Sequence, residues 1–152
     1  MSQSKRSWSV LVVDDSSEFR HAVCDWMATR AEFDVIGTAV DGAEAIRRVD
    51  GLEPELVVMD AMMPTVDGFR ATRTLKGRAA CPRIVIVSFH DSEIVRQEAW
   101  AAGADGFVPK SDLTRSLPGI VRGLDGVDDG PRLDRGASPD GARPKDDTPE
   151  GP

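Results

Sequence analysis

Aromatic residues, cysteines and long apolar runs are scarce in this sequence. Only 5% of its 152 residues are aromatic, and none is tyrosine. Its two cysteines, Cys24 and Cys81, form no Cys-x-x-Cys pattern and have no histidine at ligand spacing, which argues against a disulfide framework or a zinc site. No apolar run reaches the length of a transmembrane helix, and the apolar strand after Arg6 is too short for a signal-peptide core. These absences predict a cytoplasmic protein without a membrane segment.

The last part of the chain differs in composition from the rest. Residues 126–152 contain five glycines, five prolines, seven acids and four bases, with only four apolar residues. Such a segment cannot bury enough apolar surface to offset its ordering entropy, so we expect a disordered acidic tail at 126–152 and one folded domain at 1–125. The net charge of −7 divides into −3 for the tail and −4 for the domain, which argues against direct DNA binding.

Five short apolar runs, most of them rich in β-branched residues, punctuate the domain. They are continuous rather than alternating, which is typical of strands buried on both faces of a parallel sheet. The expected strands are Val10–Val13, Val35–Ile36, Leu56–Met59, Ile84–Val87 and Phe107–Val108.

Segments with helical periodicity separate these runs and predict a (βα)5 alternation. An α/β fold follows, a three-layer doubly wound sandwich around a five-stranded parallel sheet. Pro118 lies inside the last expected helix and should kink or shorten it. The first expected helix contains Phe19 to Met27, and the second opens at Asp41, with Glu44 three residues on, in a start that resembles a capping box. The third runs from about Val66 to Leu75. The fourth has Asp91 or Ser92 as its cap and ends at Gly103, and the fifth spans roughly Asp112 to Leu124.

Polar side chains follow four of the five expected strands. Asp14 and Asp15 come after the first, Asp60 after the third, Ser88 after the fourth and Lys110 after the fifth. Ligands of open parallel sheets bind beyond the carboxyl ends of the strands, so these groups converge on one edge. Two carboxylates about 4 Å apart repel by about 4 kcal/mol at an effective dielectric of 20, and an all-oxygen cluster favours a hard cation such as Mg²⁺. A metal, an ammonium and a hydroxyl around Asp60 suit a phosphoryl group that this carboxylate accepts as nucleophile.

Several motifs stand in a fixed order along the domain. They are Val12-Val13-Asp14-Asp15, Asp60-Ala61-Met62-Met63-Pro64 with Asp67-Gly68, Val87-Ser88, and Gly103-Ala104-Asp105-Gly106-Phe107 before Lys110. In this order and spacing the chain resembles the receiver domain of two-component response regulators, over about Ser9 to Leu124. The resemblance implies a flavodoxin-like sheet with the strand order 2-1-3-4-5.

The resemblance also implies a site and a donor. Asp60 would accept a phosphoryl group from a sensor histidine kinase. Asp15, Asp60 and the backbone carbonyl of Met62 would hold Mg²⁺, with Asp14 assisting. The domain would catalyse only its own phosphorylation and dephosphorylation, and would not be an enzyme in the wider sense.

A switch is implied as well. Lys110 and the Ser88 hydroxyl would grip the phosphoryl oxygens, and Phe107 matches the aromatic residue that turns inward as the serine moves. The added charge of about −1.5 to −2 would then bias the face formed by the fourth helix, fifth strand and fifth helix toward an unknown output protein. The protein is expected to be a monomer or a phosphorylation-dependent dimer.

Two features near the site depart from the usual receiver pattern. Phe89 places a bulky side chain after Ser88 that could narrow access to Asp60, and Pro109 removes an N–H from the fifth strand. Ser88-Phe89-His90-Asp91, with Ser111 after the lysine, resembles receivers of LuxR-type DNA-binding regulators. No helix-turn-helix pattern follows Leu124, so we expect a stand-alone receiver whose output is protein binding or phosphate flow.

Two other functions remain open at this point. A degenerate receiver could serve as a phosphorylation-independent scaffold, for which Phe89 is the only support. A small Mg²⁺-dependent aspartyl-phosphate phosphatase of the haloacid-dehalogenase type would need a second acid two residues after the nucleophile, and that position is Met62. A flavodoxin-like cofactor binder is weaker still, because no phosphate-cradling loop follows the first strand.

Overall fold

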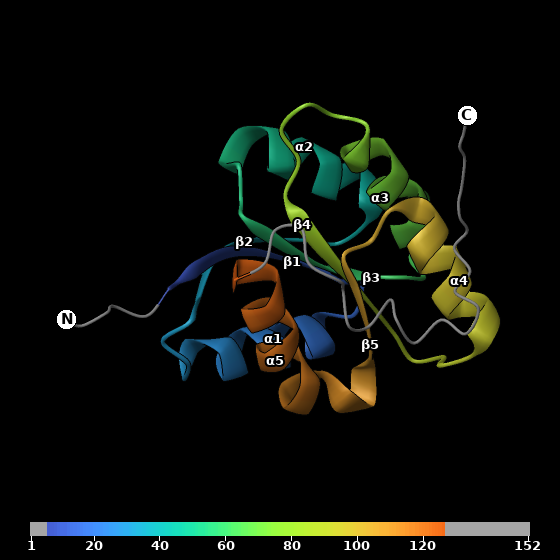
Figure 1. The fold of residues 1–152 in the computed structure, drawn as a ribbon. Coiled ribbons are helices and arrows are strands. Elements are labelled where there is room, and N and C mark those ends of the chain that lie inside the picture. Colours follow the sequence, from blue (N-terminus) through green and yellow to red (C-terminus); the bar gives the residue numbers. More distant parts are fainter. Residues whose placement is uncertain (1–5, 127–152) are drawn as a thin grey trace, which may run out of the picture.

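A computed structural model describes residues 6–126, so all of the predicted tail except Gly126 lies outside the described residues. Five strands form one parallel sheet in the order β2-β1-β3-β4-β5, as the resemblance implies (Figure 1). The strands are β1 (Trp8–Val13), β2 (Phe33–Ala39), β3 (Leu56–Asp60), β4 (Arg83–Ser88) and β5 (Gly106–Pro109). The helices are α1 (Ser17–Ala28), α2 (Gly42–Leu52), α3 (Gly68–Lys76), α4 (Glu93–Ala102) and α5 (Leu113–Gly126), with a 3₁₀ turn, η1, at Lys110–Asp112.

Four of the five strands are largely buried, and the edge strand β2 is the exception. Every residue of the central strand β3 is buried, and β1 and β4 each have a single residue that is not. The edge strand β2 is buried only at its first and last residues, so the expectation of full burial is wrong for Val35–Ile36. The other edge strand, β5, is nevertheless buried at its first three residues, so an edge position alone does not expose a strand.

Helices cover both faces of the sheet, with α1 and α5 on one face and α2, α3 and α4 on the other (Figure 1). Successive strand residues point to opposite faces, so Val10 and Val12 pack in the α1/α5 core while Leu11 and Val13 pack in the α2–α4 core. This confirms the three-layer sandwich. None of the helices between residues 6 and 126 has the length and apolar character needed to cross a membrane.

Side-chain caps explain where four of the helices begin. Each cap accepts the backbone N–H of the third residue beyond it. The expected cap Asp41 is confirmed, and the start expected at Val66 is two residues early because α3 begins after its own cap. The four capping residues are Ser16, Asp41, Asp67 and Ser92.

Two prolines lie in regular elements. The helix α5 is 14 residues long and continues past Pro118 to Gly126, so the expected shortening is wrong. Leu117 and Val121 are buried in the α1/α5 core, and their burial contributes about 1.5–3 kcal/mol each. This stabilisation offsets the free-energy cost of the hydrogen bond that Pro118 cannot make. Pro109 ends β5 at the edge of the sheet, where a missing N–H is tolerated.

Candidate functional site

Three carboxylates meet at the carboxyl edge of the sheet, where β1 and β3 are neighbours. Asp14, Asp15 and Asp60 each offer an oxygen within 4.8 Å of the other two. Asp14 and Asp60 are buried, and Asp15 is exposed. The convergence follows from the strand order, because neighbouring parallel strands end at the same edge.

Contacts within the β1–α1 connection orient Asp14. Its Oδ1 accepts the Ser16 N–H at 2.9 Å, and its backbone carbonyl accepts a hydrogen bond from Arg20 Nη1 at 2.8 Å. Its Oδ2 is buried and accepts no hydrogen bond from any residue that the structure describes, although Lys110 Nζ lies 2.8 Å away as an ion pair. A buried carboxylate oxygen with a free lone pair fits a metal ligand.

The β3–α3 connection positions Asp60. This last residue of β3 is 4% exposed, and its Oδ1 accepts the Met62 N–H at 3.4 Å. The Gly68 N–H donates to the Ala61 carbonyl at 2.9 Å, which brings the start of α3 against β3. A Cβ at Gly68 would collide with the Asp60 carbonyl oxygen, so the close approach requires glycine.

Lys110 brings a buried positive charge to the three carboxylates. It is 7% exposed, and its Nζ lies 2.8 Å from Asp14 Oδ2 and 3.4 Å from Asp60 Oδ1. The turn η1 begins at this residue, directly after β5 ends at Pro109. One ammonium among three carboxylates leaves an excess of negative charge, which a divalent cation would neutralise.

The electrostatics of Asp60 reflect this imbalance. Burial and then the neighbouring charge of Asp14 raise the pKa of Asp60 to about 7, although Lys110 and the Met62 N–H act in the opposite direction. A bound divalent cation would favour the ionised carboxylate. The donor set therefore fits Mg²⁺, which prefers carboxylate and carbonyl oxygens.

The remaining predicted site residues lie around this cluster. Ser88 is buried at the end of β4, and its hydroxyl accepts the His90 N–H at 2.9 Å. The Met62 side chain is exposed, while its backbone faces Asp60 through the N–H described above. Phe107 is buried in the α2–α4 core. No hydrogen bond joins the Ser88 hydroxyl to Asp60 among the described residues.

Residues 10–121 match the family described as the response regulator receiver domain. The chain belongs to this family. Receiver domains bind Mg²⁺ through acidic residues and interact with histidine kinases and with output or partner proteins.

The relatives of this receiver include protein-glutamate methylesterases and LuxR-family regulators. The protein-glutamate methylesterase/protein-glutamine glutaminase 1 of Pseudomonas aeruginosa is 37% identical over 118 residues, which are 76% of this chain and 32% of that protein. The chain thus spans about a third of the length of such curated relatives. A LuxR-family response regulator of Aurantimonas sp. superimposes with a TM-score of 0.72 at 29% identity, over 78% of this chain and 84% of that one.

A second solved structure links the receiver to the methylesterase group. The response regulator domain of Thermotoga maritima CheB has a TM-score of 0.73 and 28% identity, and covers 80% of this chain and 98% of that chain. The predicted likeness to LuxR-type receivers is therefore confirmed, and CheB receivers resemble this one to a similar degree.

Sequence reasoning missed the contacts of three side chains in this receiver. Phe19 and Phe89 place their rings against the Lys110 ammonium, and Arg96 places its guanidinium 4.9 Å from the centroid of the Phe107 ring. Helical periodicity identified Phe19 only as a core residue, and no sequence signal identified Arg96. The Phe19 contact joins α1 to the residue after β5, and the Arg96 contact joins the consecutive elements α4 and β5, so the pattern within a single element could not reveal either contact.

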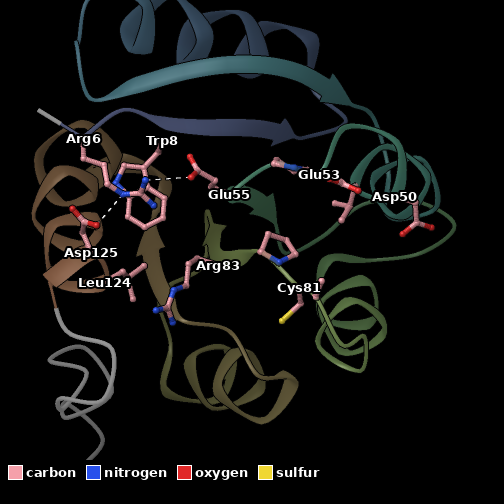
Figure 2. A pocket seen from close by; sticks show the side chains of 13 residues that line it. Arg6, Trp8, Asp50, Glu53, Glu55, Cys81, Arg83, Leu124 and Asp125 are labelled. Atoms are coloured by element: carbon pink, nitrogen blue, oxygen red, sulfur yellow. Dashed lines mark hydrogen bonds and ion pairs between the residues drawn. The ribbon is translucent and has the colours of Figure 1, made fainter. Parts of the chain in front are cut away.

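A cavity of about 640 Å³ lies at the opposite edge of the receiver, where the strands begin (Figure 2). Arg6 lies there between Glu55 and Asp125, with N–O distances of 3.2 and 2.8 Å, and 4.1 Å from the Trp8 ring centroid. Two carboxylates thus already neutralise the Arg6 charge. All the acidic and basic site residues predicted from the sequence lie at the other edge.

Proposed function

We propose that this receiver accepts a phosphoryl group on Asp60 from the phosphohistidine of a sensor histidine kinase, in a Mg²⁺-dependent step. The observation that carries the proposal is the cluster of Asp14, Asp15 and Asp60 around the buried Lys110 ammonium. An acceptor carboxylate needs positive charge on two sides of the incoming phosphoryl group, and this cluster offers an ammonium and a set of cation ligands.

In the proposed step an Asp60 carboxylate oxygen forms a bond to phosphorus while the P–N bond to the histidine breaks. The electron pair of that bond leaves with the imidazole, which takes up a proton. Asp15, Asp60 and the Met62 carbonyl would hold Mg²⁺, with Asp14 assisting, and the ion would supply positive charge opposite the phosphoryl oxygens. Lys110 turns from its carboxylate partners and donates to another phosphoryl oxygen.

The proposed switch runs from Ser88 to Phe107. The Ser88 hydroxyl now accepts the His90 N–H, and we expect it to donate to the phosphoryl group instead. That exchange moves the β4–α4 connection, where Asp91 holds Arg96 at 2.7 Å and Arg96 in turn covers the Phe107 ring. The new charge thereby alters the α4-β5-α5 face, which would bind an output protein or a second copy of the receiver.

The two alternative functions receive less support. A phosphatase would need an acid two residues after Asp60, and Met62 occupies that position with its side chain 60% exposed. A scaffold without phosphorylation gives no reason to bury Asp14 and Asp60 beside Lys110, because an unbalanced buried charge lowers stability.

Intact-mass measurement after incubation with acetyl phosphate and Mg²⁺ tests the proposal. The wild type should gain one phosphoryl group that hydroxylamine removes, and Asp60→Asn should gain none. A histidine kinase panel provides the second donor. Equal labelling of the variant would assign the acceptor to another residue, and absence of labelling with every donor would favour the scaffold.

A further inference from the structure

Two aromatic rings enclose the Lys110 ammonium together with its carboxylate partners. Nζ lies 4.2 Å from the ring centroid of Phe89 and 4.4 Å from that of Phe19. The two rings meet edge to face, with centroids 6.5 Å apart and planes inclined by 63°. Phe19 belongs to α1 and Phe89 follows β4, so distant parts of the chain form this two-ring clamp.

Core packing does not account for the position of Phe89. Its side chain is 76% exposed, whereas Phe19 is half-buried and packs against the α1/α5 core. An exposed ring gains little from the hydrophobic effect. The face of a phenyl ring carries partial negative charge and attracts an ammonium group within about 6 Å, which fits both distances.

We propose that Phe19 and Phe89 are positioning residues that keep the Lys110 ammonium in the site while its carboxylate partners are taken over by other ligands. This inference rests on the proposed phosphoryl acceptance at Asp60. It assigns to the exposed Phe89 a role in binding Lys110, in addition to any narrowing of access to the acceptor.

The need for such residues follows from competition for the same oxygen atoms. Lys110 is held by Asp14 at 2.8 Å and by Asp60 at 3.4 Å, and both carboxylates belong to the cluster that fits a divalent cation. A cation there would repel the ammonium and compete for its partners. The ring faces are not ligands for such a cation, so their attraction for Lys110 persists.

Nuclear magnetic resonance gives a readout that is independent of activity. Ring currents should shift the Lys110 Hε protons upfield in the metal-free wild type, and Lys110→Arg identifies the signal by its loss. Phe89→Leu should reduce the upfield shift, and Phe89→Tyr should retain it. Titration with MgCl₂ should leave the shift in place in the wild type and abolish it in Phe89→Leu. An unshifted Lys110 signal, or its release by Mg²⁺ in the wild type, would overturn the proposal.

The rate of labelling by acetyl phosphate distinguishes a role of Phe89 in positioning Lys110 from a role as a steric barrier to the phosphoryl donor. Loss of one ring should slow labelling about three- to tenfold in both Phe89→Leu and Phe89→Ala, while Phe89→Tyr stays within about twofold of the wild type. Ile94→Ala is the matched control, because Ile94 is also an exposed apolar residue, at 72%, and should label like the wild type.

The opposite ranking would argue for a gate. Faster labelling of Phe89→Ala, with Phe89→Leu equal to the wild type, would show that the ring only obstructs the donor and would overturn the clamp. A wild type that is not labelled at all would refute the proposed function, and the magnesium titration would still report on the clamp.

Discussion

The two edges of the sheet each bring acidic groups together around one basic side chain, with different consequences. At the amino edge Arg6 pairs with Glu55 and Asp125, and these side chains are 38–43% exposed. At the carboxyl edge Lys110 pairs with Asp14 and Asp60, which lie beside Asp15, and the side chains of Lys110, Asp14 and Asp60 are at most 5% exposed. The first cluster is balanced by two solvated acids, and the second is buried and short of positive charge.

This difference indicates which charged cluster is suited to bind a cation or a phosphoryl group. Solvent screens the Arg6 bridges, so they contribute about 0–1 kcal/mol each and leave no demand for a ligand. Burial prevents screening at the other edge and raises the pKa of Asp60 to about 7. A cavity of about 640 Å³ lies beside the balanced cluster, so the presence of a cavity does not by itself identify the edge where charge is unbalanced (Figure 2).

The largest expected effect is on the rate of Asp60 labelling, when the basic residue at the carboxyl edge is replaced and the basic residue at the amino edge serves as the control. Lys110→Met should slow labelling of Asp60 by about 100- to 1,000-fold, the usual loss for one donor to developing charge. Arg6→Met, which removes an ion-paired cation at the other edge, should label within about twofold of the wild type. Intact mass against time measures both rates, and similar losses in the two variants would refute the distinction between the edges.

The second expected effect is a change in the free energy of unfolding when an acidic residue is replaced by its amide. The sign of this change differs between the two edges. Folding raises the pKa of Asp60, so between about pH 4 and 7 the native state binds more protons than the unfolded chain and stability falls as pH rises. Asp60→Asn should therefore raise the free energy of unfolding by about 1–3 kcal/mol at pH 7.5 in EDTA, and by much less at pH 4. Urea denaturation followed by circular dichroism measures the change.

Glu55→Gln is the matched control at the amino edge. The Ser9 N–H and Arg6 lower the pKa of Glu55, so its carboxylate stabilises the fold above about pH 4 and this contribution is lost in acid. The substitution should lower the free energy of unfolding by about 0.5 kcal/mol at pH 7.5, because solvent screens the pair. A gain in stability from Glu55→Gln would contradict the comparison.

Mg²⁺ should act on one edge only. At about ten times its dissociation constant, Mg²⁺ should stabilise the wild type by about 1.4 kcal/mol, since it binds the folded carboxylate cluster. EDTA should reverse the rise in melting temperature, and Asp15→Asn should diminish it. Arg6→Met should retain the full effect of Mg²⁺. An undiminished effect in Asp15→Asn would place the cation elsewhere.

The loss of both amino-edge bridges together should also have only a small effect on stability. Arg6→Met should lower the free energy of unfolding by about 0.5–1 kcal/mol, because the two bridges are exposed and the Trp8 contact adds little more. The melting temperature at 0.1 M and 1 M NaCl measures this. The difference from the wild type should shrink at high salt, and a loss that is unchanged by salt would point to packing.

The fold and the acidic cluster were predictable from sequence because their signals are local. Continuous β-branched runs identified the buried strands, and the groups that follow these strands converge because parallel strands end at one edge. The capping role of Asp41 was equally visible, since cap and helix are adjacent in the chain. The prediction that Pro118 would shorten the last helix was wrong, because packing of one face of α5 against the core outweighed the tendency of proline to interrupt a helix.

The contacts that the sequence did not reveal join side chains from different elements of the fold. Phe89 follows β4 and Phe19 lies in α1, and only the folded chain brings both rings to the Lys110 ammonium. The pairing of Arg96 with Phe107 likewise depends on the crossing of α4 over β5. The raised pKa of Asp60 needs the degree of burial as well as the neighbouring charges, and a sequence gives only the latter.

The short edge strand β5 has a consequence for crowded solutions. It has four residues and ends in Pro109, which lacks an N–H. An edge that offers few backbone donors is a poor template for a strand from another molecule. This edge is therefore protected against aggregation by edge-to-edge strand pairing. Helices flank the same edge, and any reversible association there would have to proceed through side chains rather than through the backbone.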